Sequence, residues 1–198
     1  VKVLLAGQVA LEVLLDRPEI TILRQSLRNQ YDTYFLFDDP YRSRIRYRED
    51  EVLGEDGQVQ DVFYRLTLTS ETKEREYAKS VLLSRSRFDA PATRSLRFYR
   101  EYFQPAAEVE VRKERRRYYI RYGGTDFAVN LDRLMEPEFP GLFLEIKSRT
   151  WSKQDAERKA DLIGELLELF QVQEKELVKH EYAELASETQ RGASGEAH

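Results

Sequence analysis

Apolar and polar residues alternate strictly in two neighbouring stretches of the chain, 125–132 and 142–149. In the first stretch one face carries Phe127, Val129 and Leu131, and the other carries Asp126, Ala128, Asn130 and Asp132. In the second stretch one face carries Leu142, Leu144 and Ile146, and the other carries Phe143, Glu145, Lys147 and Arg149. Alternation with a period of two predicts strands, and the proline-containing segment between them predicts an antiparallel pair.

Similar signals predict further elements. We expect strands at 1–5, 20–37, 41–48, 62–69, 80–88 and 109–122, with 20–37 forming one or two of them. Helical spacing and capping residues predict helices at 8–17, 92–103, 152–170 and 173–185. The acidic, glycine-containing stretch 49–61 is typical of a solvent-exposed loop, and the polar tail 186–198 is typical of a disordered segment. This order predicts an α+β protein whose antiparallel strands form a large sheet or barrel with peripheral helices.

Basic residues stand at alternate positions in four of these strands. They are Arg42, Arg44, Arg46 and Arg48; Arg85 and Arg87; Lys113, Arg115 and Arg117; and Lys147 and Arg149. For a single strand, a solvated outer face is the simpler explanation. Four such strands also fit a closed or cupped sheet whose cations point at a common centre, and that arrangement requires a polyanionic ligand because the cations repel one another. Arginine suits phosphate, since its planar donors bind two oxygens and its charge does not titrate away.

Two carboxylates, Asp132 and Glu145, lie on the polar faces of the neighbouring strands. Mg²⁺ and Mn²⁺ prefer oxygen ligands and neutralise the charge that develops in phosphoryl transfer. The alternative is a salt bridge with Arg or Lys across the sheet. The residues alone leave both interpretations open.

Composition narrows the classes of protein. A chain of 198 residues with 41% hydrophobic residues suits one domain with its own core, and a net charge of −4 argues against a generic nucleic-acid-binding protein. The absence of cysteine excludes disulfides and thiolate metal sites and fits a cytoplasmic location, and His180 is the only internal histidine. No long apolar run or signal peptide is visible, so we expect no membrane association. The start at Val1 instead of Met leads us to expect either an artificial start or a domain excised from a longer protein, with fusion to another domain as one arrangement.

Seven short motifs follow one another in order along the chain. They are QYDTYFLFDDP at 30–40, R-I-R at 44–46, L-T-L-T at 66–69, K-E-R at 113–115, V-N-L-D at 129–132, G-L-F-L-E-I-K at 141–147 and Y-A-E-L at 182–185. In this order they resemble the CYTH domain, also called the triphosphate tunnel metalloenzyme fold. The resemblance covers residues 1–185.

The resemblance implies an eight-stranded antiparallel barrel that forms a tunnel lined with opposed acidic and basic residues. It implies phosphate-binding roles for Lys2, Arg44, Arg46, Arg85, Arg87, Lys113, Arg115 and Lys147. It implies that Asp132 and Glu145 hold Mg²⁺ or Mn²⁺ or orient the attacking water, as the catalytic and metal-binding residues.

The chain also departs from the family pattern. Thr69 stands where the family has a lysine, and Lys147 stands where it has the second glutamate of the last strand. Arg85 and Arg87 align with positions that usually carry acids, although a rival alignment uses 74–76 instead. Lys2 fits the lysine of the first-strand motif E-x-E-x-K, and we expect its two glutamates before Val1. These departures predict a more basic tunnel with fewer metal ligands.

Two functions from different classes follow. The chain binds a triphosphate-containing anion (inorganic triphosphate, a nucleoside triphosphate or polyphosphate) and, if active, hydrolyses it as a metal-dependent triphosphatase or related phosphohydrolase. Alternatively, it is a noncatalytic polyanion-binding or regulatory module of a larger protein. Nucleotide cyclisation is a third possibility within the family, and nothing in the sequence selects it. In every case we expect a small polyphosphate or nucleotide ligand and no specific nucleic-acid partner.

Overall fold

Long antiparallel strands dominate the computed structural model, which describes residues 1–5, 11–38, 44–69, 75–77, 81–83, 86–172, 176–178 and 180–187. The strands are β1 (Lys2–Leu5), β2 (Thr21–Leu36), β3 (Arg44–Leu53), β4 (Val59–Thr69), β5 (Arg75–Tyr77), β6 (Val81–Leu83), β7 (Ser86–Pro91), β8 (Ala107–Tyr122), β9 (Thr125–Glu136) and β10 (Leu142–Lys147). The helices are α1 (Leu11–Leu15), α2 (Leu96–Phe103), α3 (Lys153–Leu169) and a short helix at 182–187. No helix of the described residues is long and apolar enough to cross a membrane.

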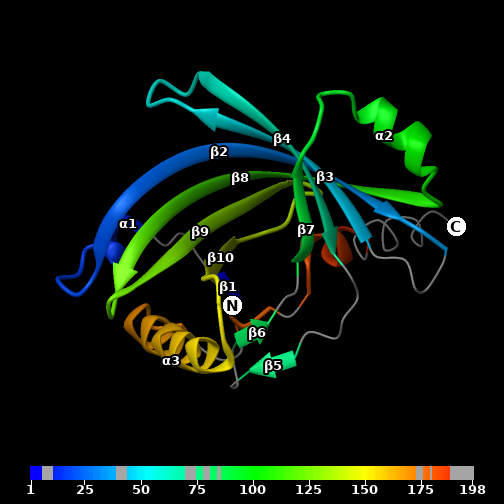
Figure 1. The fold of residues 1–198 in the computed structure, drawn as a ribbon. Coiled ribbons are helices and arrows are strands. Elements are labelled where there is room, and N and C mark those ends of the chain that lie inside the picture. The colour runs from blue at the N-terminus through cyan, green and yellow to red at the C-terminus, as the bar shows by residue number, and fades with distance from the viewer. Residues whose placement is uncertain are drawn as a thin grey trace, which may run out of the picture.

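Eight strands form one antiparallel sheet in the order β1-β10-β9-β8-β2-β3-β4-β7, and β5 pairs with β6 in a separate hairpin. The sheet is strongly curved, with β2 and β8 arching over its middle (Figure 1). Among the described residues, no backbone pairing joins the edge strands β1 and β7. The prediction of an eight-stranded antiparallel sheet is confirmed, and the structure shows it as an open curved sheet rather than as a closed barrel.

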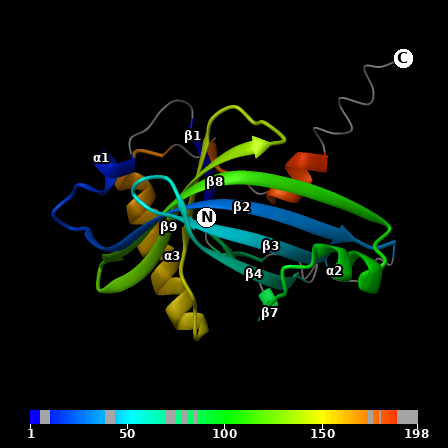
Figure 2. The same cartoon turned by 90° about the horizontal axis from the view of Figure 1, so that it is seen from above.

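Two helices cover the outer, convex face of the sheet, at opposite sides of the molecule (Figures 1 and 2). Helix α3 packs Ile163 and Leu166 against outward-facing residues of β8, β9, β10 and β1. Helix α2 packs Tyr99 against Phe35 and Tyr47 of β2 and β3. Because the apolar side of each strand faces these helices, the polar side faces the concave interior.

A third apolar cluster lies on the concave side itself. Tyr182, Ala183 and Ala186 of the helix at 182–187 pack against inward-facing residues of the sheet, which include Phe143 and Val111. This helix therefore fills part of the concave face with apolar side chains. The remainder of that face is left to charged side chains.

Several boundaries differ from the sequence-based expectations. The prediction of a solvent loop at 49–61 is wrong, because β3 continues to Leu53 and β4 begins at Val59. The acidic residues that suggested a loop have partners across the sheet, since Asp50 accepts hydrogen bonds from Arg28 and Gln30. The actual turn spans only 54–58, where Gly57 adopts a φ of 76° that favours glycine.

Other elements are shorter or divided. The predicted strand at 80–88 corresponds to two strands, β6 and β7, on either side of residues outside the described part. The predicted helix at 92–103 begins only at Leu96, after Ser95, whose hydroxyl accepts a hydrogen bond from the Phe98 amide. In the described part of the segment 173–185, which is 176–178 and 180–185, an α-helix covers 182 onward, and residues 188–198 of the tail lie outside the described residues. The strands at 109–122, 125–132 and 142–147 and the N-cap Ser152 are confirmed.

The packing of α3 can be tested with one core substitution. Leu166 is fully buried against the sheet, so Leu166→Ala should lower the free energy of unfolding by about 2–5 kcal/mol through lost burial and a residual cavity. Leu23→Ala on the half-exposed part of β2 is the matched control and should change it by less than about 1 kcal/mol. Urea denaturation measures both, and similar losses for the two variants would contradict this packing.

Candidate functional site

Charged side chains alternate with apolar or exposed ones along the strands at the centre of the sheet. On β8, Lys113 and Arg115 are buried, whereas Arg112, Glu114 and Arg116 are exposed. The same alternation places Asp32 of β2 and Arg48 of β3 on the concave side. The strand period of two therefore directs one charged set inward from several strands.

These side chains enclose a cavity of about 170 Å³ on the concave face. It is lined by Lys2, Tyr34, Arg46, Arg48, Lys113, Arg115, Arg117, Glu145, Lys147, Glu181 and Tyr182. Seven of these residues are cationic and two are anionic. The strands β1, β2, β3, β8 and β10 and the segment before the C-terminal helix all contribute, so residues from both ends of the chain meet here.

Asp32 anchors one side of the cavity. Its side chain is inaccessible to solvent, and its oxygens accept hydrogen bonds from Arg48 Nε at 2.5 Å and from a second Arg48 nitrogen at 2.6 Å. Lys113 Nζ lies 3.3 Å from the same carboxylate. Burial alone would raise the pKa of Asp32, but the positive charges of Arg48 and Lys113 outweigh it and hold this pKa well below its usual range.

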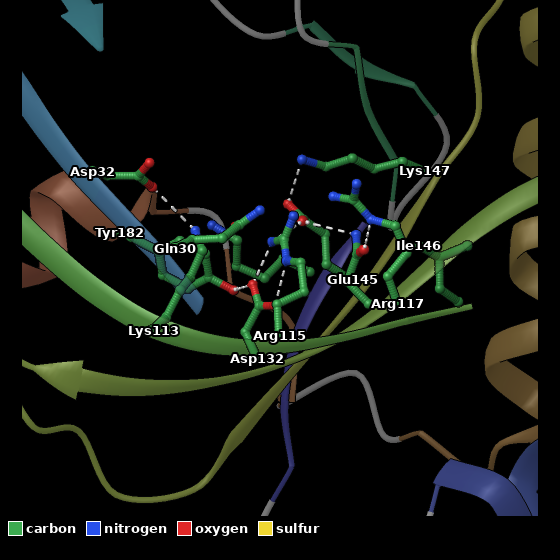
Figure 3. Close-up of polar contacts among 12 residues, drawn as sticks. Gln30, Asp32, Lys113, Arg115, Arg117, Asp132, Glu145, Ile146, Lys147 and Tyr182 are labelled. Carbon is green, nitrogen blue, oxygen red and sulfur yellow. Dashed lines mark hydrogen bonds and ion pairs between the residues drawn. The ribbon is translucent and has the colours of Figure 1, made fainter. Parts of the chain in front are cut away.

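Asp132 is engaged in a similar way on the other side. It accepts two hydrogen bonds from Arg115, at 2.6 and 2.5 Å, and one from the Tyr182 hydroxyl at 2.7 Å (Figure 3). Burial opposes ionisation of Asp132, yet the adjacent Arg115 keeps its pKa lowered. The same carboxylate, together with burial, raises the pKa of Tyr182. The Asp132 carboxylate is therefore ionised, and both of its oxygens accept hydrogen bonds from protein side chains.

Glu145 faces the cavity directly and bridges three donors. Its oxygens lie 2.8 Å from Lys147 Nζ and 3.0 Å from an Arg115 nitrogen, and the Asn130 amide donates at 3.4 Å (Figure 3). Burial would raise the pKa of Glu145, but Lys147 and Arg115 hold it well below its usual range. Glu145 is thus an ionised carboxylate already neutralised by two cations.

The contacts of Asp132 and Glu145 test whether these carboxylates could hold the divalent metal that the family resemblance implies. Asp132 and Glu145 make strong contacts to Arg115, which occupies the space between them. Among the described residues, no group of three or more His, Cys, Asp or Glu side chains is placed to hold a metal ion. The described carboxylates therefore do not fit a divalent-cation site, and their partners are the cations of the protein itself.

The cavity cations are not all neutralised. Burial, together with the neighbouring Arg48 and Arg115, lowers the pKa of Lys113 to about 7 against the opposing effect of Asp32. Burial and Arg115 also lower the pKa of Arg117. Buried Arg46 Nε has no hydrogen-bond partner among the described residues, although another Arg46 nitrogen donates to Thr67. Crowded cations with spare donors are what an anion would stabilise.

The C-terminal segment closes one side of the cavity. The Nζ atoms of Lys2 and Lys113 lie over the Tyr182 ring, at 4.1 and 4.4 Å from its centroid. Lys2 Nζ also donates to the His180 carbonyl at 3.0 Å. Glu181, two residues before the apolar Ala183, lines the cavity wall. Contacts of Lys2 and Lys113 with the Tyr182 ring thus hold the C-terminal segment against the sheet.

The structure brings together most of the predicted site residues. Those that line the cavity are Lys2, Arg46, Lys113, Arg115, Glu145 and Lys147, and Asp132 lies directly behind Arg115. Arg44 is directed to the C-terminal segment, 3.5 Å from Glu181 and 3.6 Å from Glu184. Arg85 lies outside the described residues, and Arg87 is described only as a backbone position of β7.

Four members of the site had no individual role in the sequence-based predictions. Arg48 and Arg117 were among the alternating cations expected to face a common centre, but the family resemblance implied no role for them. Asp32 lies within the motif at 30–40, so its alternate position on β2 was a usable signal. The role of Tyr182 as a donor to Asp132 depends on a contact across 50 residues that no local pattern encodes.

Comparison with known proteins identifies the fold. No family model matches the chain, and no curated protein matches its sequence. Among solved structures, the PH1819 protein of Pyrococcus horikoshii has a TM-score of 0.63 and 19% identity, covering 95% of this chain and 97% of its own. A conserved hypothetical protein of Pyrococcus furiosus (TM-score 0.55, 17% identity, 93% and 99% covered) and the PH1012 protein of P. horikoshii (0.55, 14%, 93% and 96%) are also similar. These likenesses show a shared fold.

The buried pair around Asp32 predicts a pH-dependent stability. Asp32→Asn leaves Arg48 and Lys113 without their counter-charge and should lower the free energy of unfolding by roughly 3–5 kcal/mol at pH 7. Because the pKa of Asp32 is lowered in the folded state, its contribution is present above about pH 4 and is lost as pH falls below that value. The difference between wild type and variant should therefore shrink in urea titrations from pH 7 to pH 3.

Asp126→Asn is the matched control, because Asp126 forms an exposed pair with Arg121. This variant should unfold almost as the wild type does at every pH. A difference for Asp32→Asn that stayed constant from pH 7 to pH 3 would contradict the assignment of an ionised, cation-paired Asp32.

Proposed function

We propose that the cavity binds a triphosphate-containing anion. The observation that carries this proposal is the charge imbalance of the cavity wall, where seven cationic side chains meet two carboxylates. Counting the buried Asp32 and Asp132 as well, four carboxylates face seven lysine and arginine side chains, which leaves three positive charges when Lys113 is protonated. A small polyanion supplies the missing negative charge, and guanidinium groups bind phosphate oxygens in pairs.

The position of the cations suits a short phosphate chain. Lys113, Arg115 and Arg117 follow one another on the concave side of β8, at intervals of about 6.6 Å for alternate residues. Arg46 and Lys147 line the same cavity from β3 and β10. Several phosphate groups in a row would each meet a donor from at least one strand. The order of motifs that resembles the CYTH domain supports the same ligand class.

The contacts favour binding without turnover. Metal-assisted hydrolysis needs carboxylates that are free to hold a cation, and both oxygens of Asp132 already accept hydrogen bonds from Arg115. Glu145 lies between Lys147 and Arg115. We therefore propose a polyanion-binding module, the role that a regulatory or recruiting domain of a larger protein would have, ahead of a phosphohydrolase.

A pair of neighbouring arginines tests the binding site. Arg117 lines the cavity, whereas Arg116 is exposed on the opposite face of the same strand. Arg117→Gln should weaken the binding of inorganic triphosphate about 10- to 100-fold, because a charged hydrogen bond to phosphate is lost. Arg116→Gln should leave the dissociation constant within about twofold. Equal effects of the two substitutions in calorimetric titrations would show that the anion is not held in the cavity.

An assay of phosphate release distinguishes binding from hydrolysis. We expect the chain to bind inorganic triphosphate and ATP and to release no phosphate from either, with or without Mg²⁺ or Mn²⁺, because Asp132 and Glu145 are engaged by protein cations. Metal-dependent release that is abolished by Glu145→Gln would contradict the module and support a metal-dependent hydrolase. The Glu145→Gln protein must retain its thermal unfolding transition for that comparison.

A further inference from the structure

A second row of inward-facing side chains lies directly beyond the cavity. Backbone register places Tyr119 of β8 opposite Arg24 of β2 on one side and opposite Ala128 of β9 on the other. On β10, Lys147 lies opposite Ala128. The row Arg24–Tyr119–Ala128–Lys147 therefore crosses four adjacent strands. It is one step, about 6.6 Å, along β8 from the cavity residue Arg117.

Tyr119 lies between two guanidinium groups. The guanidinium carbon of Arg24 is 4.4 Å from the centroid of the Tyr119 ring, a cation–π distance. Burial would raise the pKa of Tyr119, yet Arg117 and Arg24 lower it because both act on its hydroxyl. An aromatic ring thus follows the cations Lys113, Arg115 and Arg117 at the next alternate position of β8. Arg24 itself is exposed, next to an irregularity in the pairing of β2 with β8.

Ala128 has the shortest side chain of the row. In the backbone register, Ala128, with its single methyl group, lies between Tyr119 and Lys147. The Lys147 side chain is 59% exposed, and Tyr119 is half-buried. Neighbouring positions on the concave face carry long side chains, such as Arg117 opposite Asn130. The row therefore places a short side chain between an aromatic ring and a cation, one strand step from the cavity residue Arg117.

We propose that this row is a subsite for a planar heterocycle attached to the phosphate chain. The heterocycle lies over Ala128 with its face or edge on Tyr119, and the phosphates extend past Arg117 into the cavity. Aromatic side chains hold nucleobases by stacking, and arginine strengthens such stacks. This inference rests on the proposed function and deepens it, since it selects a nucleoside triphosphate over inorganic triphosphate or polyphosphate as the preferred ligand.

Two substitutions test the subsite and leave every proposed phosphate-binding residue of the cavity unchanged in the sequence. Tyr119→Leu removes the stacking ring, and Ala128→Leu places a larger side chain where the heterocycle would lie. Each should weaken the binding of ATP about 5- to 100-fold while leaving the dissociation constant of inorganic triphosphate within about twofold. Tyr119→Phe keeps the ring and should retain most of the ATP affinity. Tyr102→Leu, at a 72% exposed tyrosine on α2, is the matched control and should change neither.

The outcomes separate this inference from the function on which it rests. In one outcome, the wild type binds inorganic triphosphate, but Tyr119→Leu and Ala128→Leu either leave ATP binding unchanged or weaken the binding of ATP and inorganic triphosphate equally. That result would overturn the subsite and leave the proposed anion site intact. If long-chain polyphosphate binds more tightly than ATP and is weakened by Arg24→Gln but not by Tyr119→Leu, the row belongs to an extended phosphate chain and the subsite is overturned. If the wild type binds neither ATP nor inorganic triphosphate, both proposals fail.

Discussion

Burial of charge on the concave face is the constraint on which the rest of the structure depends. An ionised carboxylate in the interior is stable only when cations and hydrogen-bond donors surround it. Asp32 satisfies this condition through Arg48 and Lys113, and Asp132 satisfies it through Arg115 and Tyr182. Even with these two carboxylates counted, the cavity has three more lysine and arginine side chains than carboxylates. The proposed anion binding therefore rests on the same charged side chains that stabilise the sheet.

The apolar clusters make this arrangement possible. Helices α2 and α3 bury the convex face, so the strands do not need an apolar concave face to be stable. The helix at 182–187 covers one part of the concave face with Ala183 and Ala186 and contributes Tyr182 to the charged part. Its preceding segment is held by the pairing of Arg44 with Glu181. The C-terminus is thus part of the cavity wall, and Arg44 acts on the site through that segment.

Strand alternation predicted the central part of the fold and most of the cavity residues. The stretch at 142–147 became β10 with Glu145 and Lys147 on the predicted face, because a period of two leaves no other choice once Leu144 and Ile146 are buried. The acidic composition of 49–61 led to the wrong prediction of a solvent loop. In the structure, acidic residues of this stretch such as Asp50 have cross-strand partners. The partners of Asp132 and Glu145 could not be predicted, since they depend on the register of separate strands and on a tyrosine 50 residues away.

Calorimetric titration with inorganic triphosphate tests most directly whether one polyphosphate anion binds in the basic cavity. At about 150 mM NaCl, where weak surface electrostatics are largely screened, we expect saturable binding of one anion per chain that sulfate does not reproduce. The excess of cations at the cavity wall is the reason, since only a chain of phosphates reaches several of them at once. Absence of saturable heat, or equal binding of sulfate and triphosphate, would contradict the account.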